Sequence, residues 1–332
     1  MKKSPKRLPR EVTVRVPGST SNCGAGFDTL GLALQIYNEV TLARSPLGVL
    51  APAAGGSRLA LPMLRQVIAT WEQHSGTTLD FGLSFRVEGA VPMARGLGSS
   101  VTVLAGALAA LNELTGVGLS KHELVGLVAS IEGHPDNAAA GVLGGFCVAR
   151  SDPGTGAYVD SVRVAVPADL RFIVCSPSVK VLTKESRGVL PPTLPYFDAV
   201  KSINSAAYLT AAFATGDYAK LRHAVSDFMH EPYRLPSIPG GRNAIAAGNA
   251  AGALTGWLSG SGSSVLCVAR KADVPAVGRA MAQAFHAEKI DGQVFVLRAD
   301  NAGLKITRRC WGTAAVMPTA RSGRCGPRVP TT

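Results

Sequence analysis

A glycine-rich segment that can bind phosphate joins a predicted strand to a predicted helix and reads Pro92-Met93-Ala94-Arg95-Gly96-Leu97-Gly98-Ser99-Ser100. Glycines let main-chain amides turn toward an anion, and the free amides and partial positive charge at a helix start favour phosphate. Its serines can cap the helix, or hold a phosphate or a metal-bound water. The segment is not a G-x-x-x-x-G-K-[ST] loop. It is not a G-x-G-x-x-G dinucleotide loop either, because Val101 stands where the last glycine should be. As a pattern alone it is equally compatible with a simple turn.

Two further loops are rich in small residues. VRVPGSTSNCGAGFDTLGLAL leaves a strand that we expect to end at Pro17, and its Asp28 is either a helix cap or a functional carboxylate. The other, Leu258-Ser259-Gly260-Ser261-Gly262-Ser263-Ser264, predicts a tight turn when taken alone. Three such loops that converge on one anion are harder to explain by turn chemistry.

A polar run at Glu132-Gly133-His134-Pro135-Asp136-Asn137 precedes an apolar LGGF segment that we expect to begin a strand. Carboxylate oxygens suit Mg²⁺, and a carboxylate near a hydroxyl can act as a base. A lone histidine is more often structural. This one lies beside Asp136 in a short polar run, which favours a functional role over a structural one.

The elements that must position these segments follow from hydrophobic periodicity. Start signals for helices include Ser120 three residues before Glu123, and Asp217 before an amphipathic run. Helices and strands mix without a regular strand–helix repeat, so the fold class is α+β. We expect strands at 11–16, 36–43, 82–88, 145–149, 159–166, 170–175, 264–269 and 293–297, and helices at 62–74, 99–114, 121–131, 198–214, 217–230, 242–250 and 273–287.

Length and composition predict a folded chain of two lobes. The chain has 332 residues, 46% of them hydrophobic and 17% charged, and single cores beyond about 250–300 residues usually split. The best candidate boundary is Val166-Pro167-Ala168-Asp169. The longest mainly apolar stretch, 101–111, is far shorter than the roughly 20 residues of a membrane helix, so no membrane partner is expected.

Charge and cysteine usage narrow the class of protein further. The net charge is +12, but ten basic residues in 1–10 and 308–332, which hold no acid, leave the body with only +2. We therefore expect solvated basic ends and no specific nucleic-acid partner. The six cysteines form no CxxC pair and sit mostly in apolar runs, which indicates free thiols and a cytoplasmic location.

Together these motifs resemble the homoserine kinases, a branch of the GHMP kinase family. The order is PxSxxNxGxGFDTLGLAL, PxARGLGSS, EGHPDN with LGGF, SGSGxxV and ADNAGLK, and it covers about residues 11–307. The chain departs from the usual family wording at four positions, none of which removes a charge. These departures put loop rigidity in question more than chemistry, and they are Cys23, Ala25, Val101 and Ser263.

The resemblance implies a two-lobed fold with ATP and the amino acid in the cleft between the lobes. The N-terminal lobe would be like the second domain of ribosomal protein S5, and the C-terminal lobe would be ferredoxin-like. We accordingly divide the chain into a basic flexible start (1–10), an ATP-binding lobe (11–168), a substrate-binding lobe (169–307) and a basic disordered tail (308–332).

The resemblance also assigns the ATP and metal site. The glycine loop would cradle the phosphates, so a side chain at Gly98 would crowd them, and Ser100 with Glu132 would hold Mg²⁺. The ATP-binding residues would be Pro92, Met93, Ala94, Arg95, Gly96, Leu97, Gly98, Ser99, Ser100, Val101 and Thr102. Apolar residues between about 50 and 70 would contribute to the adenine pocket.

For the amino acid, the resemblance implies cations at one end and an anion at the other. Thr183-Lys184-Glu185-Ser186-Arg187 and Glu231-Pro232-Tyr233-Arg234 match segments whose arginines hold a carboxylate. Asp28 and Asn22 match the residues around the ammonium. The substrate-binding set would be Asn22, Asp28, His134, Asn137, Thr183, Arg187 and Arg234, and the catalytic candidates are Asn137, Asp136 and Arg187. Homoserine kinases are thought to lack a dedicated base, so Asp136 in that role stays open.

The implied reaction is the transfer of phosphate from ATP to the side-chain hydroxyl of L-homoserine, with Mg²⁺ as cofactor. ATP and L-homoserine would be the partners, and a homodimer is compatible with this reading. Three alternatives remain: a sister kinase acting on a sugar or mevalonate, a non-catalytic nucleotide-binding protein on the same fold, and a nucleic-acid binder that uses its basic ends.

Overall fold

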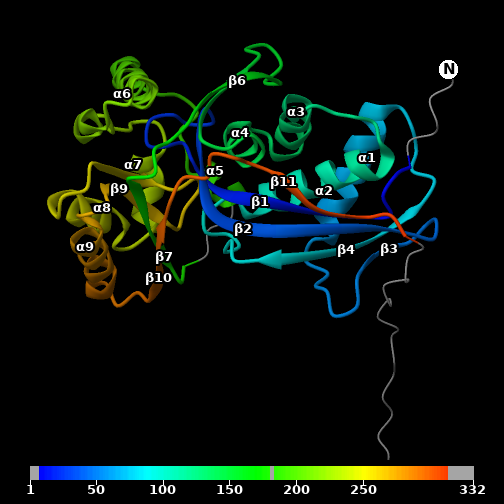
Figure 1. Cartoon of the computed structure of the whole chain (residues 1–332). Coiled ribbons are helices and arrows are strands. Elements are labelled where there is room, and N and C mark those ends of the chain that lie inside the picture. Colours follow the sequence, from blue (N-terminus) through cyan, green and yellow to red (C-terminus); the bar gives the residue numbers. More distant parts are fainter. Residues whose placement is uncertain (1–6, 180–182, 313–332) are drawn as a thin grey trace, which may run out of the picture.

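The computed structural model describes residues 7–179 and 183–312, and it has two lobes that lie side by side (Figure 1). Within these residues the first lobe holds a seven-stranded sheet in the order β11-β1-β2-β4-β3, with β5 pairing β2 and β6. Its strands are β1 (Glu11–Ser21), β2 (Leu30–Ser45), β3 (Leu50–Pro52), β4 (Gly82–Gly89), β5 (Phe146–Ser151), β6 (Tyr158–Val164) and β11 (Lys305–Cys310).

Strand β1 runs further than expected. It stays paired with β2 as far as Ser21, and the register shifts between Pro17 and Gly18. A proline lacks the N–H that a ladder needs, and the irregularity at this point lets the strand continue. The prediction that the strand ends at Pro17 is therefore wrong, and the extra residues carry polar side chains to the edge of the cleft.

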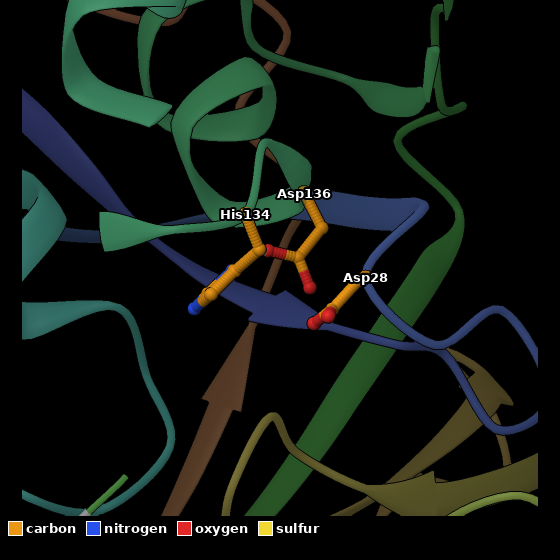
Figure 2. A group of neighbouring side chains, drawn as sticks. All are labelled: Asp28, His134 and Asp136. Atoms are coloured by element: carbon orange, nitrogen blue, oxygen red, sulfur yellow. The ribbon is translucent and has the colours of Figure 1, made fainter. Parts of the chain in front are cut away.

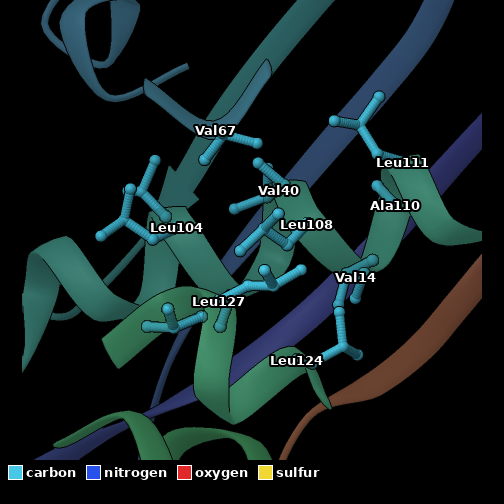
Figure 3. Close-up of a cluster of buried hydrophobic side chains, with 14 of the residues drawn as sticks. Val14, Val40, Val67, Leu104, Leu108, Ala110, Leu111, Leu124 and Leu127 are labelled. Atoms are coloured by element: carbon cyan, nitrogen blue, oxygen red, sulfur yellow. The ribbon is translucent and has the colours of Figure 1, made fainter. Parts of the chain in front are cut away.

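Four helices cover this sheet: α1 (Leu61–Ser75), α2 (Ser99–Thr115), α3 (Lys121–Glu132) and α4 (Asp136–Leu143). Their apolar faces and those of β1, β2 and β4 form one core, part of which Figure 3 shows. Helix α3 begins with the expected reciprocal cap between Ser120 and Glu123. Helix α4 was not expected, since its residues read as the approach to a strand.

The second lobe is ferredoxin-like, as expected. Its strands β7 (Leu170–Pro177), β8 (Thr255–Leu258), β9 (Val265–Arg270) and β10 (Gly292–Leu297) form a sheet in the order β10-β7-β9-β8. The main helices are α6 (Tyr196–Thr215) and α8 (Gly241–Ala250), which both lie between β7 and β8 in the chain, and α9 (Val274–Ala287), between β9 and β10. The order of elements is thus β-α-β-β-α-β, with two helices in the first helical position. Shorter elements are α5 (Thr183–Gly188), α7 (Glu231–Arg234) and the 3-10 helices η1 (Tyr218–His223) and η2 (Leu235–Ser237).

The two lobes share a hydrophobic core. One buried cluster joins Leu30, Leu32 and Phe146 of the first sheet to Phe172 and Trp257 of the second. Phe146 on β5 stacks on Phe213 of α6 with ring centroids 4.2 Å apart. The indole of Trp257 donates a hydrogen bond to Thr20 Oγ1 of β1 at 3.0 Å. Packed side chains therefore fix the two lobes relative to each other beside the cleft.

The expected helix at 217–230 is wrong. A 3-10 helix covers only Tyr218–His223, and a separate short helix, α7, starts at Glu231. The Asp227 carboxylate accepts hydrogen bonds from the main-chain amides of Met229, His230 and Glu231, at 2.7–2.9 Å. A side chain that takes up amides in this way competes with helix continuation and caps the next helix instead.

The expected boundary between the second lobe and the C-terminal tail, at residue 307, is also wrong. Residues 305–310 form β11, which pairs antiparallel with β1 in the sheet of the first lobe. They thus belong to neither the second lobe (169–307) nor a disordered tail (308–332). Arg308 and Arg309 form ion pairs with Glu11 and Glu113, which neutralises part of the basic end. Residues 1–6 and 313–332, also included in the predicted basic ends, lie outside the described residues.

Five cysteines lie in the described part of the chain, and all have free thiols. Cys23, Cys147, Cys175 and Cys267 are buried, as expected, and burial raises the pKa of each thiol, to about 12 for Cys147 and Cys175. Such thiols are unreactive and act as small apolar side chains. In the described ranges, no helix has the length and apolar character needed to cross a membrane.

Candidate active site

The three loops of small residues converge on one cavity between the lobes. Gly260 accepts a hydrogen bond from the Asn22 side chain at 3.0 Å, and its own amide donates to Ser21 O at 3.2 Å. Ser259 Oγ donates to Gly96 O at 2.6 Å. The cavity is lined by Ser21, Asn22, Phe27, Asp28, Ala94, Arg95, Gly96, Gly98, Ser99, Ser100, Val101, Glu132, His134, Asp136, Asn137, Arg187, Arg234, Gly260 and Ser261.

The glycine loop presents an uncapped helix start to this cavity. Helix α2 begins after Gly98, which has a φ of 67°, and no side chain caps its first amides. Gly96 also has a positive φ, of 71°, and a Cβ there would lie 1.9 Å from Ser259 O. Both positions need glycine, because a positive φ is strained for a side chain, and a Cβ at Gly96 would also push two of the loops apart. The free amides and the helix dipole favour an anion here.

A second, more apolar cavity adjoins the glycine loop. It shares Ala94, Ser99 and Ser100 with the first cavity, and Pro92 and Met93 line only this one. Ser57, Leu59, Ala60 and Met63, from the stretch around the start of α1, line it as well, together with Val87, Ala90, Val91 and Val103. An apolar space beside a helix start that favours an anion suits a nucleobase.

Ser100 and Glu132 meet at the rim of the first cavity. Ser100 lies in the first turn of α2 and Glu132 is the last residue of α3, and Ser100 Oγ donates to Glu132 Oε1 at 2.5 Å. Both side chains supply the hard oxygen donors that Mg²⁺ prefers, and both are open to the cavity. The donor set therefore fits the expected metal.

His134, Asp136 and Asp28 form a compact group on the cavity wall (Figure 2). His134 Nδ1 lies 2.5 Å from Asp136 Oδ1, which also accepts the main-chain amide of Asn137 at 2.6 Å. Burial alone would lower the pKa of His134, but the hydrogen bond to Asp136 and the charges of both carboxylates outweigh it, so the pKa is raised. The two neighbouring carboxylates thus favour the protonated form of the imidazole.

Asp136 keeps one free acceptor. Its side chain is 1% exposed, and among the described residues its Oδ2 has no hydrogen-bond partner. In Figure 2 one carboxylate oxygen of Asp136 is directed toward Asp28. A buried, unpaired carboxylate oxygen is costly, and a cationic or hydroxyl donor placed in the cavity would satisfy it.

Asn137 is held by two serines that sequence reasoning missed. Ser19 Oγ donates to Asn137 Oδ1 at 2.8 Å, and Asn137 Nδ2 donates to Ser21 Oγ at 2.9 Å. Both serines lie on the part of β1 beyond Pro17. A strand that is predicted to end at Pro17 does not place them at the cavity. These two bonds fix the orientation of the Asn137 amide at the cavity wall.

The two arginines flank an aromatic ring that was also missed. The guanidinium carbons of Arg187 and Arg234 lie 5.4 and 5.1 Å from the ring centroid of Phe27. Arg187 Nη2 forms an ion pair with Asp28 Oδ1 at 2.7 Å. Arg234 is 3% exposed, and burial and the charge of Arg187 lower its pKa to about 10, which still leaves it charged at neutral pH.

Some predicted site residues lie elsewhere. The side chains of Leu97 and Thr102 are 1% and 0% exposed and line neither cavity. The Thr102 hydroxyl instead bonds the side chain of Asn38 and Ser99 O. Only the main-chain atoms of Leu97 and Thr102 are therefore left for the predicted role in ATP binding. The side chain of Thr183 lies outside the described residues.

Comparison with known proteins decides the family. Models of the GHMP kinases N terminal domain and the GHMP kinases C terminal region match residues 62–145 and 209–287. A homoserine kinase of Moorella thermoacetica is 38% identical over 87% of this chain and 98% of its own length. The chain belongs to the homoserine kinase branch of the GHMP kinases. A homoserine kinase of Carboxydothermus hydrogenoformans is 35% identical, over 88% of this chain and 95% of its own.

Solved structures agree with this assignment. The crystal structure of homoserine kinase from Cytophaga hutchinsonii has a TM-score of 0.79 at 27% identity and covers 92% of this chain and 99% of its own. A mevalonate kinase has a TM-score of 0.62 at 12% identity, over 87% of this chain and 99% of its own, which is a likeness of fold alone. As a kinase of this family the chain uses ATP.

Proposed function

We propose that this chain transfers the γ-phosphoryl group of ATP to the side-chain hydroxyl of L-homoserine, giving O-phospho-L-homoserine and ADP. The observation that carries the proposal is the ion pair between Asp28 and Arg187, with buried Arg234 beside it, in a cavity that also holds an uncapped helix start. An α-amino acid has an ammonium and a carboxylate, and this site offers one partner for each. Mevalonate and sugars lack the ammonium.

Substrate binding would exchange one ion pair for two. The Asp28–Arg187 pair is partly exposed, and such pairs contribute only about 0–1 kcal/mol, so the substrate can displace it at little cost. The ammonium would then lie at Asp28 and Asn22, and the carboxylate at Arg187 and Arg234. Planar guanidinium groups suit a carboxylate because they pair with both of its oxygens.

The reaction itself requires positioning and charge neutralisation more than covalent help from the protein. Amides of the 96–100 segment would bind the phosphates, while Ser100 and Glu132 would hold Mg²⁺, which neutralises phosphate charge when bound. Asn137 would bind the acceptor hydroxyl. That oxygen forms a bond to the γ-phosphorus as the bond to the ADP oxygen breaks.

The hydroxyl proton would pass to a phosphate oxygen. Asp136 has a free oxygen, yet its other oxygen already holds His134 and the amide of Asn137. We therefore assign Asp136 mainly to orienting these two neighbours. The loose transition state of phosphoryl transfer gains little from a general base.

The direct test is an acceptor panel. Purified protein with Mg-ATP is offered L-homoserine, L-serine, mevalonate and galactose, and ADP release and product mass are measured. O-phosphohomoserine should form fastest. Preferred phosphorylation of mevalonate or galactose would replace the proposal by a sister activity, and ATP binding without any product would favour a non-catalytic role.

Arg234→Ala is expected to raise the KM for homoserine tenfold or more. The variant loses a charge-assisted contact of about 1.5–3 kcal/mol. The KM for ATP should stay within twofold of the wild-type value, and thermal melting checks the fold. The matched control is Arg279→Ala, on an exposed site of α9. A folded Arg234→Ala protein with unchanged homoserine KM would remove this arginine from the pocket.

A further inference from the structure

A buried histidine outside both cavities links the two halves of the amino-acid pocket. His230 is 0% exposed and lies just before α7. Its Nε2 is 2.8 Å from the carbonyl oxygen of Gly24, in the loop between β1 and β2 that carries Asn22 and Asp28. A carbonyl only accepts, so Nε2 carries the proton. Its Nδ1 is buried and has no partner among the described residues.

The histidine is fixed at its main chain as well. The Asp227 carboxylate accepts the amides of His230 and Glu231 at 2.8 and 2.7 Å. The amide of Arg234 donates to His230 O at 3.0 Å, so the arginine sits one helical turn beyond the histidine. A displacement of the His230 ring would therefore be passed to Arg234 through a single short helix.

Phe27 completes the connection from the other side. The ring centroid of Phe27 is 5.5 Å from that of His230. The guanidinium groups of Arg187 and Arg234 contact the same Phe27 ring. Phe27 precedes Asp28 directly in the chain. The His230 ring thus touches the segment that holds the pocket's anion, and its main chain leads to one of the pocket's cations.

We propose that His230 is a positioning residue for the amino-acid substrate, which ties the Asn22–Asp28 loop to α7 and so sets where the two charged ends of the substrate are held. This inference rests on the proposed function. Burial lowers the pKa of His230 more than Asp227 and the Gly24 carbonyl raise it, so the ring stays neutral and Nδ1 needs no acceptor. Gly24, Phe27 and Asp227, which contact the ring or the amide of His230, all lie outside the 92–102 segment, so we expect ATP binding not to depend on this histidine.

The test compares His230→Phe with His230→Gln. Phenylalanine keeps a ring beside Phe27 but leaves the buried Gly24 carbonyl without its donor, whereas the glutamine amide can reach the same carbonyl. For His230→Phe we expect the homoserine KM to rise about tenfold and the ATP KM to change less than twofold, because small misplacements of binding groups have large effects. His230→Gln should stay within threefold of wild type for both substrates.

The matched control is His223→Phe, at an exposed histidine of η1. A second variant covers the case in which His230→Phe does not fold. Gly24 has a φ of 78°, and a Cβ there would lie 2.5 Å from Val225 Cγ1, so Gly24→Ala pushes the same loop away with His230 intact. It should also raise the homoserine KM selectively.

The inference would be overturned by an unchanged homoserine KM in folded His230→Phe or Gly24→Ala, or by equal increases of KM for homoserine and ATP. Failure of His230→Gln to restore the wild-type value would do so as well. Wild-type turnover of homoserine tests the proposed function separately. If the wild type prefers another amino alcohol, the same KM ratios are measured with that acceptor.

Discussion

Gly98→Val is expected to abolish ATP turnover while the chain still folds. A Cβ at Gly98 would lie 2.4 Å from Ser19 Oγ and 3.2 Å from Asn137 Oδ1, and the φ of 67° is strained for any side chain. The substitution thus separates Ser19 from Asn137 and displaces the first amides of α2 from the cavity. The sequence alone predicts that a side chain at Gly98 crowds the phosphates. In the structure, the Cβ collides instead with Ser19 of β1 and Asn137 of α4.

The expected loss in kcat/KM is about 10³-fold or more, since both phosphate binding and hydroxyl orientation are disturbed. ATP affinity is measured by calorimetry, and folding by circular dichroism and thermal melting. Gly76→Val is a close control, because Gly76 has a φ of 66° and nothing within 4 Å of its Cβ position. Normal ATP affinity in a folded Gly98→Val protein would refute the phosphate cradle.

Glu132→Gln is expected to lower kcat about 10²-fold and to raise the Mg²⁺ concentration needed for half-maximal rate. The amide oxygen of glutamine can still accept the hydrogen bond from Ser100, so the contact between α2 and α3 persists while the negative charge is lost. A carboxylate is a far better Mg²⁺ ligand than a neutral amide, and metal-ion charge neutralisation is a large part of phosphoryl transfer.

The measurement is a Mg²⁺ titration of the steady-state rate at saturating ATP and homoserine. Glu288→Gln, at the exposed end of α9, is the control for loss of one carboxylate charge. An identical Mg²⁺ response in Glu132→Gln and wild type would move the metal away from the Ser100–Glu132 pair.

Elements with strong local patterns were predicted well. Helix α2 is apolar over almost its whole length, and α3 carries its own reciprocal cap, so neighbours in sequence were enough to find both. Failures came where a distant or competing partner decides. Strand β11 is short and basic, and only pairing with β1 and with Glu11 and Glu113 makes it a strand. The Asp227 carboxylate ended a helix that the apolar spacing had favoured.

The candidate site divides in the same way. Asp28, His134, Asp136, Arg187 and Arg234 were named from motifs, and they do line one cavity. Their supports were not named, because the roles of Ser19, Ser21, Phe27 and His230 depend on contacts with residues far away in sequence. The signal that could have pointed to Ser19 and Ser21 is the run of polar residues that follows Pro17.

The core shared between the lobes limits how this enzyme can move during turnover. A clam-shell opening would bring Phe146, Phe172 and Trp257 into water, at about 1.5–3 kcal/mol or more for each large side chain, and would stretch the Trp257–Thr20 bond. A hinge at this junction is therefore unfavourable. Product release must instead depend on small shifts of the segments that rim the cleft, with both sheets acting as a fixed frame.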